Sequence, residues 1–456
     1  MKKISKSLIL SICLLSSCNN NNIEIITHTV PGDFVDGSYF FPMNTLTTLR
    51  TFNQEQNDEI VDGFDNIVIN LSKEVDRYHN YEGINNLKTI NDSCGNDKEI
   101  KISNELFELL KLSVDITKLT QGKFNLAMGN IIDLYSDKLI EESSGRIDTL
   151  PDASLIQEAM LSIPTYEDID NVIVLNEERK TIKLNKYNDK NVVISLGAIA
   201  KGFVMDKAYE YLKDYNYPCL FDAGSSTMAM LGQNPTNQEG KWSVSFKCPY
   251  LSYVNENPLL CNITLNGNTF ISTSGDYTQN YFYENENNSY SLMHHIIDPY
   301  KGVSNNFIRS VSIVSNNAKL SVLDALTTSL FNCYNDEELL NIIDKFETNY
   351  KCDLSFVLTK PYGYKKKKRS PLISKLRYKN YKELQQAINT RYLHYNKTID
   401  YINEKEKTGE IIVLRPSRKV KMSRIEKDVN KLQEMYDLGV EDTKNKLKEI
   451  EKFLKK

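Results

Sequence analysis

One segment of the sequence places a carboxylate and a hydroxyl where they could share a cation. In Val322–Ser329, Asp324 and Thr328 are four residues apart, so a helix would bring both side chains to one face. Mg²⁺ prefers oxygen ligands, takes few of them from the protein and keeps places for phosphate oxygens. A buried hydrogen bond between an aspartate and a threonine has the same spacing, so the residues alone leave both interpretations open.

Two adjacent histidines form a second candidate for chemistry. They stand in His294-His295-Ile-Ile-Asp-Pro299. Neighbouring side chains on an extended chain point in opposite directions, so this pair does not predict a metal site with two histidine ligands. We expect one exposed imidazole that can accept a proton.

Three turns with small or hydroxyl-bearing residues follow apolar segments: Ser195–Gly202, Asp222–Ser226 and Ile271–Tyr277. The first, at a strand-to-helix junction, could bring backbone close to a ligand and point a helix N-terminus at phosphate, with Lys201 adding a positive charge. It is not a P-loop, because lysine precedes glycine and no Ser or Thr follows. Tight packing would explain the same residues, and the second segment alone is typical of an ordinary turn.

The elements that must position these residues mix helices and strands without regular alternation. Hydrophobic periodicity predicts helices at 58–78, 103–122, 200–215, 318–334 and 336–348. Strands are predicted at 171–176, 181–184 and 192–196, in six short segments between 219 and 314, and at 353–358. This mixture predicts an α+β fold rather than a doubly wound sheet.

Composition restricts the class of protein. The chain has 456 residues, 40% hydrophobic and 25% charged, which predicts two or three globular domains and excludes a wholly disordered or collagen-like chain. After the first 20 residues, no apolar run approaches the roughly 18 residues of a membrane-spanning helix, so an integral transporter is excluded. The scattered cysteines form no C-x-x-C pair that would indicate zinc or a redox dithiol, and their spacing predicts no disulfide pairing.

Charge is distributed unevenly along the chain. Residues 365–456 hold 26 basic and 13 acidic residues, a net charge of +13, whereas the preceding residues carry −17. This asymmetry predicts a separate C-terminal unit that does not contribute to the site described above. Its basic residues could face an anionic lipid surface, although a solvated helical surface is the simpler interpretation, and we expect no nucleic-acid partner. Helices are predicted at 381–405, 423–438 and 441–454, with a strand at 411–415.

The first 18 residues have the pattern of an export signal. Lys2, Lys3 and Lys6 precede the apolar Leu8–Leu15, and Leu15-Ser-Ser-Cys18 resembles a bacterial lipobox. The resemblance implies cleavage before Cys18, acylation of that cysteine and a lipid-anchored protein on the extracytoplasmic face of the cell membrane, with 19–40 as a tether. An ordinary signal peptide with an incidental cysteine is the alternative.

Taken together and in order, the motifs resemble the FAD:protein FMN transferases of the ApbE family. Besides the segments above, the match includes Met43–Thr45, Asp76–His79 and Thr120–Asn125, and it extends from about Met43 to Thr359. The resemblance implies a two-lobed α+β domain over 41–360 with FAD in the cleft between the lobes. It also implies transfer of the FMN half of FAD to a Thr or Ser hydroxyl of an acceptor protein, with release of AMP. The acceptors implied are proteins of membrane redox systems.

The resemblance further implies a role for individual residues. The Mg²⁺ site would comprise Asp324, Thr328 and the backbone carbonyl of Ala198, with Thr327 adjacent, and His295 would be catalytic. Contacts to FAD would come from Met43, Tyr78, Lys123, Phe124, Asn125, Ser195, Lys201 and Ile297.

Three positions depart from the family pattern. Asn125 and Ser195 replace residues that are usually acidic, and Asp222-Ala-Gly-Ser replaces N-A-G-G. They put the affinity for FAD in doubt more than the class of reaction. Two alternatives therefore stay open: an Mg²⁺-dependent FAD pyrophosphatase that yields FMN and AMP, and an FAD-binding lipoprotein without catalysis.

The C-terminal part resembles a different family. Segments 376–381, 391–396, 410–416 and 424–428 are similar to the C-terminal region of bacterial patatin-like phospholipases. Those enzymes need a G-x-S-x-G nucleophile elbow, which this chain lacks, so no lipase activity is implied. We therefore expect a basic linker at 361–371 and a mainly helical module at 372–456.

Overall fold

The computed structural model describes most of the chain: residues 23–35, 38–52, 58–139, 144–215, 217–249, 259–285, 289–350, 354–357, 362–367, 379, 382–409, 411–421 and 428–453. The predicted signal peptide and its acylation site Cys18 lie outside these residues. None of the described helices is long and apolar enough to cross a bilayer.

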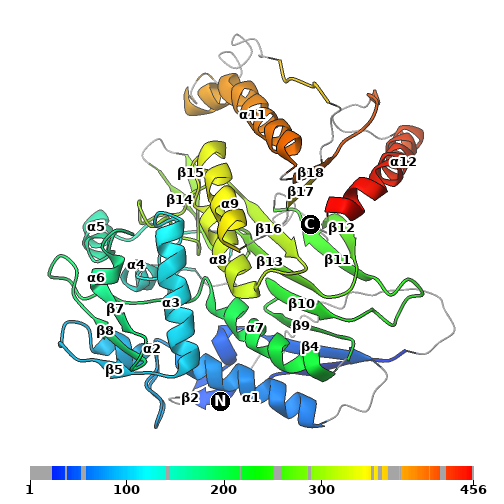
Figure 1. Cartoon of the computed structure of the whole chain (residues 1–456). Helices are drawn as coiled ribbons and strands as arrows, with labels where there is room; N and C mark the ends of the chain where they lie inside the picture. Colours follow the sequence, from blue (N-terminus) through cyan, green and yellow to red (C-terminus); the bar gives the residue numbers. More distant parts are fainter. Residues whose placement is uncertain are drawn as a thin grey trace.

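An antiparallel sheet of six strands forms the centre of the molecule (Figure 1). Its strand order is β1-β4-β9-β10-β13-β16, and each pair of neighbours is antiparallel. The strands are β1 (Ile25–Thr29), β4 (Thr47–Phe52), β9 (Cys219–Ala223), β10 (Thr227–Leu231), β13 (Thr269–Gly275) and β16 (Ser310–Ser315). This order places the N-terminal strands beside strands from the middle of the chain.

The alternation of side chains along β10 gives the sheet two covered faces. Ala229 and Leu231 point into a core shared with helices α1 (Asp58–Val75), α7 (Ala200–Leu212) and α8 (Leu320–Phe331). Met230 points the other way, into a smaller core with Trp242 from the hairpin of β11 (Trp242–Lys247) and β12 (Leu259–Leu265).

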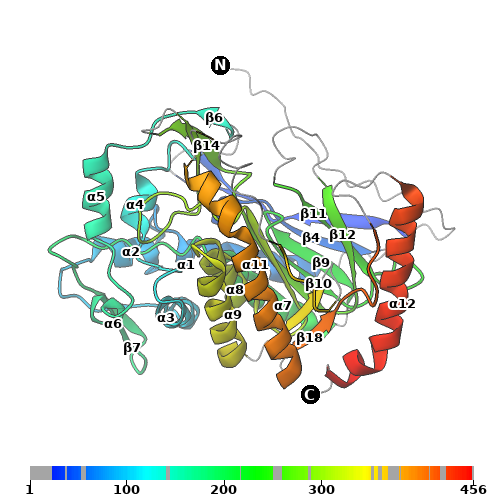
Figure 2. The same cartoon turned by 90° about the horizontal axis from the view of Figure 1, so that it is seen from above.

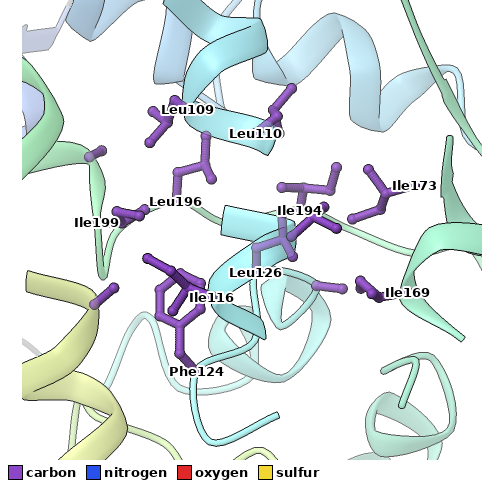
Figure 3. Packing of buried hydrophobic residues seen from close by; sticks show 14 of the residues in the cluster. Leu109, Leu110, Ile116, Phe124, Leu126, Ile169, Ile173, Ile194, Leu196 and Ile199 are labelled. Atoms are coloured by element: carbon purple, nitrogen blue, oxygen red, sulfur yellow. The ribbon is translucent and has the colours of Figure 1, made fainter. Parts of the chain in front are cut away.

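A second lobe packs around α3 (Asn104–Leu119), whose apolar side lies in the largest core (Figure 3). Two loops meet in this core: Phe124 and Leu126 from one pack with Leu196 and Ile199 from the other. The other elements of this lobe are α2 (Leu87–Asp92), α4 (Gly129–Asp133), α5 (Ala153–Leu161), α6 (Ile169–Val172), β5 (Ile100–Lys101), β7 (Ile173–Asn176) and β8 (Thr181–Leu184). Smaller strands are β2 (Asp33–Val35), β3 (Ser38–Phe40), β6 (Arg146–Ile147), β14 (Asn280–Glu284) and β15 (Tyr290–His294).

Helix α8 joins the two lobes because it is apolar nearly all round. Leu320 and Leu323 belong to the core beneath the sheet, whereas Val322, Ala325 and Leu326 belong to the core around α3. Its first turn is held by Asp206 of α7, whose carboxylate accepts hydrogen bonds from the Leu320 and Ser321 backbone N–H groups at 2.6 and 3.0 Å. The mixed helices and strands confirm the predicted α+β class.

Among the described residues, the C-terminal module contacts the rest of the protein through a strand and a helix. Its strand β18 (Ile411–Leu414) pairs in parallel with β17 (Leu354–Val357), which follows helix α9 (Asp336–Tyr350). Helix α11 (Lys382–Thr408) lies beside α9 (Figure 2) and forms ion pairs with it. Helix α12 (Val429–Phe453) packs on β18.

Two predicted elements differ from the structure. Residues 192–196 form no strand, because Ile194 N–H donates to the Asn91 side chain and Ser195 N–H to the Leu126 carbonyl instead of to a neighbouring strand. The two helices predicted at 423–438 and 441–454 are one continuous helix, α12, which passes through Gly439. Gly439 does not end the helix, because a glycine inside a helix costs only about 1 kcal/mol relative to alanine.

Candidate active site

Asp324 lies inside α8, where hydrogen-bond donors from three other elements surround its carboxylate. Gly202 N–H donates to Oδ2 at 2.7 Å, and the hydroxyls of Thr227 and Ser272 donate to Oδ1 at 2.9 and 2.6 Å. Burial raises the pKa of Asp324, while the charge of Lys201 and these hydrogen bonds act in the opposite direction. The side chain is thus held in one orientation at the junction of α7, α8 and the sheet.

The other candidate metal ligands lie on α8 itself or just before α7. Thr327 is buried, donates to the Asp324 carbonyl at 2.9 Å and accepts from Ser274 at 2.9 Å, so its hydroxyl is already used. Thr328 and Ala198 are partly exposed. The candidate metal ligands are all oxygen atoms and include a single carboxylate, a set that fits Mg²⁺. The described residues hold no group of three or more His, Cys, Asp or Glu side chains that would suit another metal.

Lys201, in the first turn of α7, connects the site to the sheet. Its ammonium donates to the Ser226 hydroxyl at 2.7 Å, in the turn between β9 and β10. Gly224 and Ser225 in that turn have φ angles of 65° and 56°, and a side chain on Gly224 would collide with Thr45. The charge of Lys201 helps to lower the pKa of His295 and partly offsets the rise that burial causes in the pKa of Asp324.

The two histidines are separated, as the sequence predicts. His294 is fully buried, with its ring 5.2 Å from that of Phe331 and Nε2 3.2 Å from the Asn305 carbonyl. His295 is exposed to solvent. The surrounding protein and the charge of Lys201 both hold the pKa of His295 below its ordinary value, so the ring is neutral at pH 7.

The loop Thr120–Asn125 reaches the far end of α8. Lys123 donates to the Asn332 carbonyl at 3.1 Å, pairs with Glu338 of α9 at 2.9 Å and has its ammonium 3.4 Å from the centroid of the Tyr334 ring. A cavity of about 390 Å³ lies here, lined by Thr120, Gln121, Lys123, Tyr166, Tyr300, Tyr334, Glu338, Asn341 and Ile342.

Two residues of this loop that are predicted to contact FAD, Phe124 and Asn125, have side chains that interact with other parts of the protein. Phe124 is in the hydrophobic core (Figure 3), so only its backbone can contact a ligand. Asn125 closes a local turn: it donates to the Pro164 carbonyl at 3.0 Å and accepts from Ala127 N–H at 2.9 Å.

The remaining predicted contacts lie on several elements. Met43 has a left-handed backbone (φ 54°) and packs against the core beneath the sheet. Tyr78 is half exposed, with the Arg77 guanidinium 4.5 Å from its ring centroid. Ser195 is bonded to the Thr120–Asn125 loop through Leu126, and the buried Ile297 has its carbonyl 3.5 Å from the Asn332 amide.

Six of the predicted residues therefore form two groups, one around the middle of α8 and one at its C-terminal end. Asp324, Thr327, Lys201 and His295 are linked by hydrogen bonds or charge, and Lys123 and Ile297 are linked through Asn332. Sequence reasoning missed Thr227, Asn332 and Glu338, which no motif marks. It singled out Ser272 and Ser274 only as members of a hydroxyl-rich segment, not as partners of Asp324 and Thr327.

Comparisons with known proteins agree with this architecture. A sequence model of the ApbE family matches residues 43–352, and one described as a domain of unknown function, DUF6363, matches residues 381–455. The FAD:protein FMN transferase of Klebsiella pneumoniae is 26% identical over 233 residues, which cover 51% of this chain and 63% of that relative. The one of Haemophilus influenzae is 25% identical, with 58% and 70% covered.

Solved structures share the fold. The ApbE protein from Thermotoga maritima has a TM-score of 0.53 and 19% identity, covering 71% of this chain and 93% of that one. The flavin transferase ApbE from Vibrio cholerae has a TM-score of 0.51 and 17% identity, covering 72% and 91%. Because the family match spans 310 of the 456 residues, this chain belongs to the ApbE family.

Proposed function

We propose that this protein transfers FMN from FAD to a Thr or Ser hydroxyl of an acceptor protein and releases AMP. Membership of the ApbE family supports this reaction, and curated relatives carry the name FAD:protein FMN transferase. The observation that carries the proposal is the first turn of α7, where Gly202 N–H holds the buried carboxylate of Asp324 at 2.7 Å and the neighbouring Lys201 donates to the Ser226 hydroxyl at 2.7 Å.

The residues divide the work as the reaction requires. Transfer from a pyrophosphate forms a bond between the acceptor oxygen and the FMN phosphorus and breaks the bond to the bridging oxygen, which leaves with AMP. Lys201 offsets negative charge on the phosphates, and the neutral His295 accepts the proton of the attacking hydroxyl. Asp324, Thr328 and the carbonyl of Ala198 would hold Mg²⁺, which when bound supplies further charge neutralisation at the pyrophosphate.

The exposure of His295 favours one competing reaction. Water could take the place of the acceptor hydroxyl, in which case the protein would be an FAD pyrophosphatase that yields FMN and AMP. A mixture of protein, FAD, Mg²⁺ and a threonine-containing acceptor, analysed by mass spectrometry, distinguishes the two. FMN covalently bound to the acceptor supports transfer, free FMN with AMP supports hydrolysis, and unchanged FAD contradicts both.

The proposal includes a location. A lipobox-like sequence at Cys18 supports acylation and attachment to the extracytoplasmic face of the cell membrane, where acceptors of membrane redox systems would be within reach. Metabolic labelling with a radioactive fatty acid tests this: label should enter the wild-type protein and be absent from Cys18→Ser. Equal labelling of both would contradict the anchor.

A further inference from the structure

The C-terminal module contacts one particular helix of the transferase domain. Along α11, Lys397 pairs with Glu337, Thr398 donates to Asp336 at 3.3 Å, and Lys405 pairs with Asp344. All three partners lie on α9, and the strand after α9 pairs with β18 of the module. The basic module and the acidic body thus meet with complementary charge along α9.

The first turn of α9 also contacts Lys123, one of the residues predicted to contact FAD. Glu338, next to Glu337, pairs with Lys123 at 2.9 Å and accepts a hydrogen bond from Tyr334 N–H at 2.9 Å. Lys123 is only 8% exposed, so water cannot readily take the place of these hydrogen-bond and ion-pair partners of its ammonium. Further along α9, Ile342 lines the same cavity as Lys123.

We propose that the C-terminal module positions Lys123 of the flavin site by holding α9 in place. For what Lys123 binds, the inference rests on the proposed function. The ion pairs from α11 fix the exposed side of α9, while Ile342 and Phe346 fix its inner side in the core around α3. Glu337 and Glu338 are consecutive residues in the first turn, so a displacement on the module side moves the partner of Lys123. Glu338 is therefore a positioning residue.

The test reverses the charge of the module where it touches α9, in the full-length chain. Lys397→Glu combined with Lys405→Glu should raise the KM for FAD about three- to tenfold, as expected from the loss of one exposed and one partly buried ion pair, while kcat changes less than about twofold. Restoring opposite charges with Glu337→Lys and Asp344→Lys should return the KM towards the wild-type value. An unchanged KM in the folded double variant would overturn the proposal.

A matched control lies within the module itself. Arg418 pairs with Glu434 at 2.6 Å without touching α9, so Arg418→Glu should leave the KM for FAD unaltered. An equal increase in KM from this control would overturn the proposal by attributing the effect to overall charge. If the double reversal does not fold, Lys405→Gln provides a milder change with the same expected direction, and no change in its KM also overturns the proposal.

Two further measurements connect the module to Lys123 and separate this inference from the proposed function. Glu338→Gln should raise the KM for FAD, and adding the α11 reversals should raise it little further, because both act on the same lysine; fully multiplicative effects would overturn the link. Amide hydrogen exchange can be followed without FAD. Faster exchange in Asp336–Tyr350 of the reversed variant supports the inference even if wild-type protein fails to transfer FMN, and unaltered exchange overturns it.

Discussion

At the residue scale, the site depends on a carboxylate with no freedom to move. Asp324 receives hydrogen bonds from Gly202, Thr227 and Ser272, so its orientation is set before any ligand arrives. This preorganisation distinguishes it from an exposed acidic residue, because its side chain would lose little entropy on binding the cation of the proposed function.

Replacing this carboxylate should strongly reduce metal-dependent turnover. In Asp324→Asn the amide nitrogen faces groups that themselves donate, so we expect a loss of stability of about 1–3 kcal/mol and a fall in turnover of about 10²-fold or more. Turnover of FAD against Mg²⁺ concentration, with chemical unfolding as the control for folding, measures both. A folded variant with normal turnover at limiting Mg²⁺ would exclude Asp324 as the metal ligand.

Replacing His295 should affect the chemical step rather than binding. His295→Asn should slow transfer by about 10²–10⁴-fold while FAD still binds, because only the proton acceptor is lost. Since the pKa of His295 is lowered, the acidic limb of wild-type kcat/KM should lie below the ordinary histidine value of about 6.5. A limb at or above that value, or normal transfer by the variant, would show that another group accepts the proton.

His294 should instead make stability depend on pH. Burial and the neighbouring His295 lower the pKa of His294 to about 3 in the folded protein, against about 6.5 in an unfolded chain. The folded state therefore binds fewer protons, so its stability is complete above about pH 6.5 and is lost as the pH falls towards the folded value, by at most about 1.4 kcal/mol per pH unit from this group. Urea unfolding of wild type and His294→Asn between pH 7 and pH 5 should show a weaker pH dependence in the variant, and equal slopes would contradict this origin.

At the element scale, α8 connects the two groups of candidate site residues, with Asp324 in its first half and Asn332 at its C-terminal end. Its first turn has no capping side chain of its own, and Asp206 of α7 supplies one from a distance. A cap from another helix fixes α8 relative to α7, and so fixes Asp324 relative to Lys201.

Removing this cap should therefore reduce stability. Asp206→Ala leaves the Leu320 and Ser321 N–H groups without an acceptor, which should lower the free energy of unfolding by about 1–2 kcal/mol. Ser321→Ala, which removes only the hydroxyl that also donates to Asp206, should cost less. Chemical unfolding of both variants tests the order, and an equal or reversed order would mean that the backbone groups are satisfied without Asp206.

Sequence patterns predicted the helices and strands better than the contacts between residues that are distant in the sequence. The amphipathic spacing of α1 and α3 identifies these helices because each buries one face. The extended segment 192–196 was predicted as a strand because apolar character does not reveal that its N–H groups bond to Asn91 and Leu126. Glu338 could not be foreseen at all, since its contact with Lys123 joins residues 215 positions apart whose surroundings carry no shared pattern.

At the scale of the whole molecule, the uneven charge of the chain contributes to the contact between the C-terminal module and α9. The sequence predicts an independent basic unit, whereas in the structure the module shares a two-stranded sheet with the strand after α9 and places lysines against acidic residues of that helix. The boundary predicted near residue 360 therefore separates β17 from β18, its partner in that sheet.

This arrangement predicts that salt loosens the module. At about 1 M NaCl the Debye length falls to about 3 Å, so the pairs of Lys397 and Lys405 should contribute little. A loss of about 1 kcal/mol lowers the Tm of a domain of 150–250 residues by about 2–4 °C, and we expect a smaller decrease for this longer chain. Calorimetry should show a lower first transition in 1 M than in 50 mM NaCl for the wild type and for Arg418→Glu, whose altered pair lies away from α9. In Lys397→Glu with Lys405→Glu the like charges along α9 repel at low salt, so screening should raise that transition instead. A decrease of the same size in all three proteins would mean that salt acts on the chain as a whole and that the contact with α9 is held by the β17–β18 pairing alone.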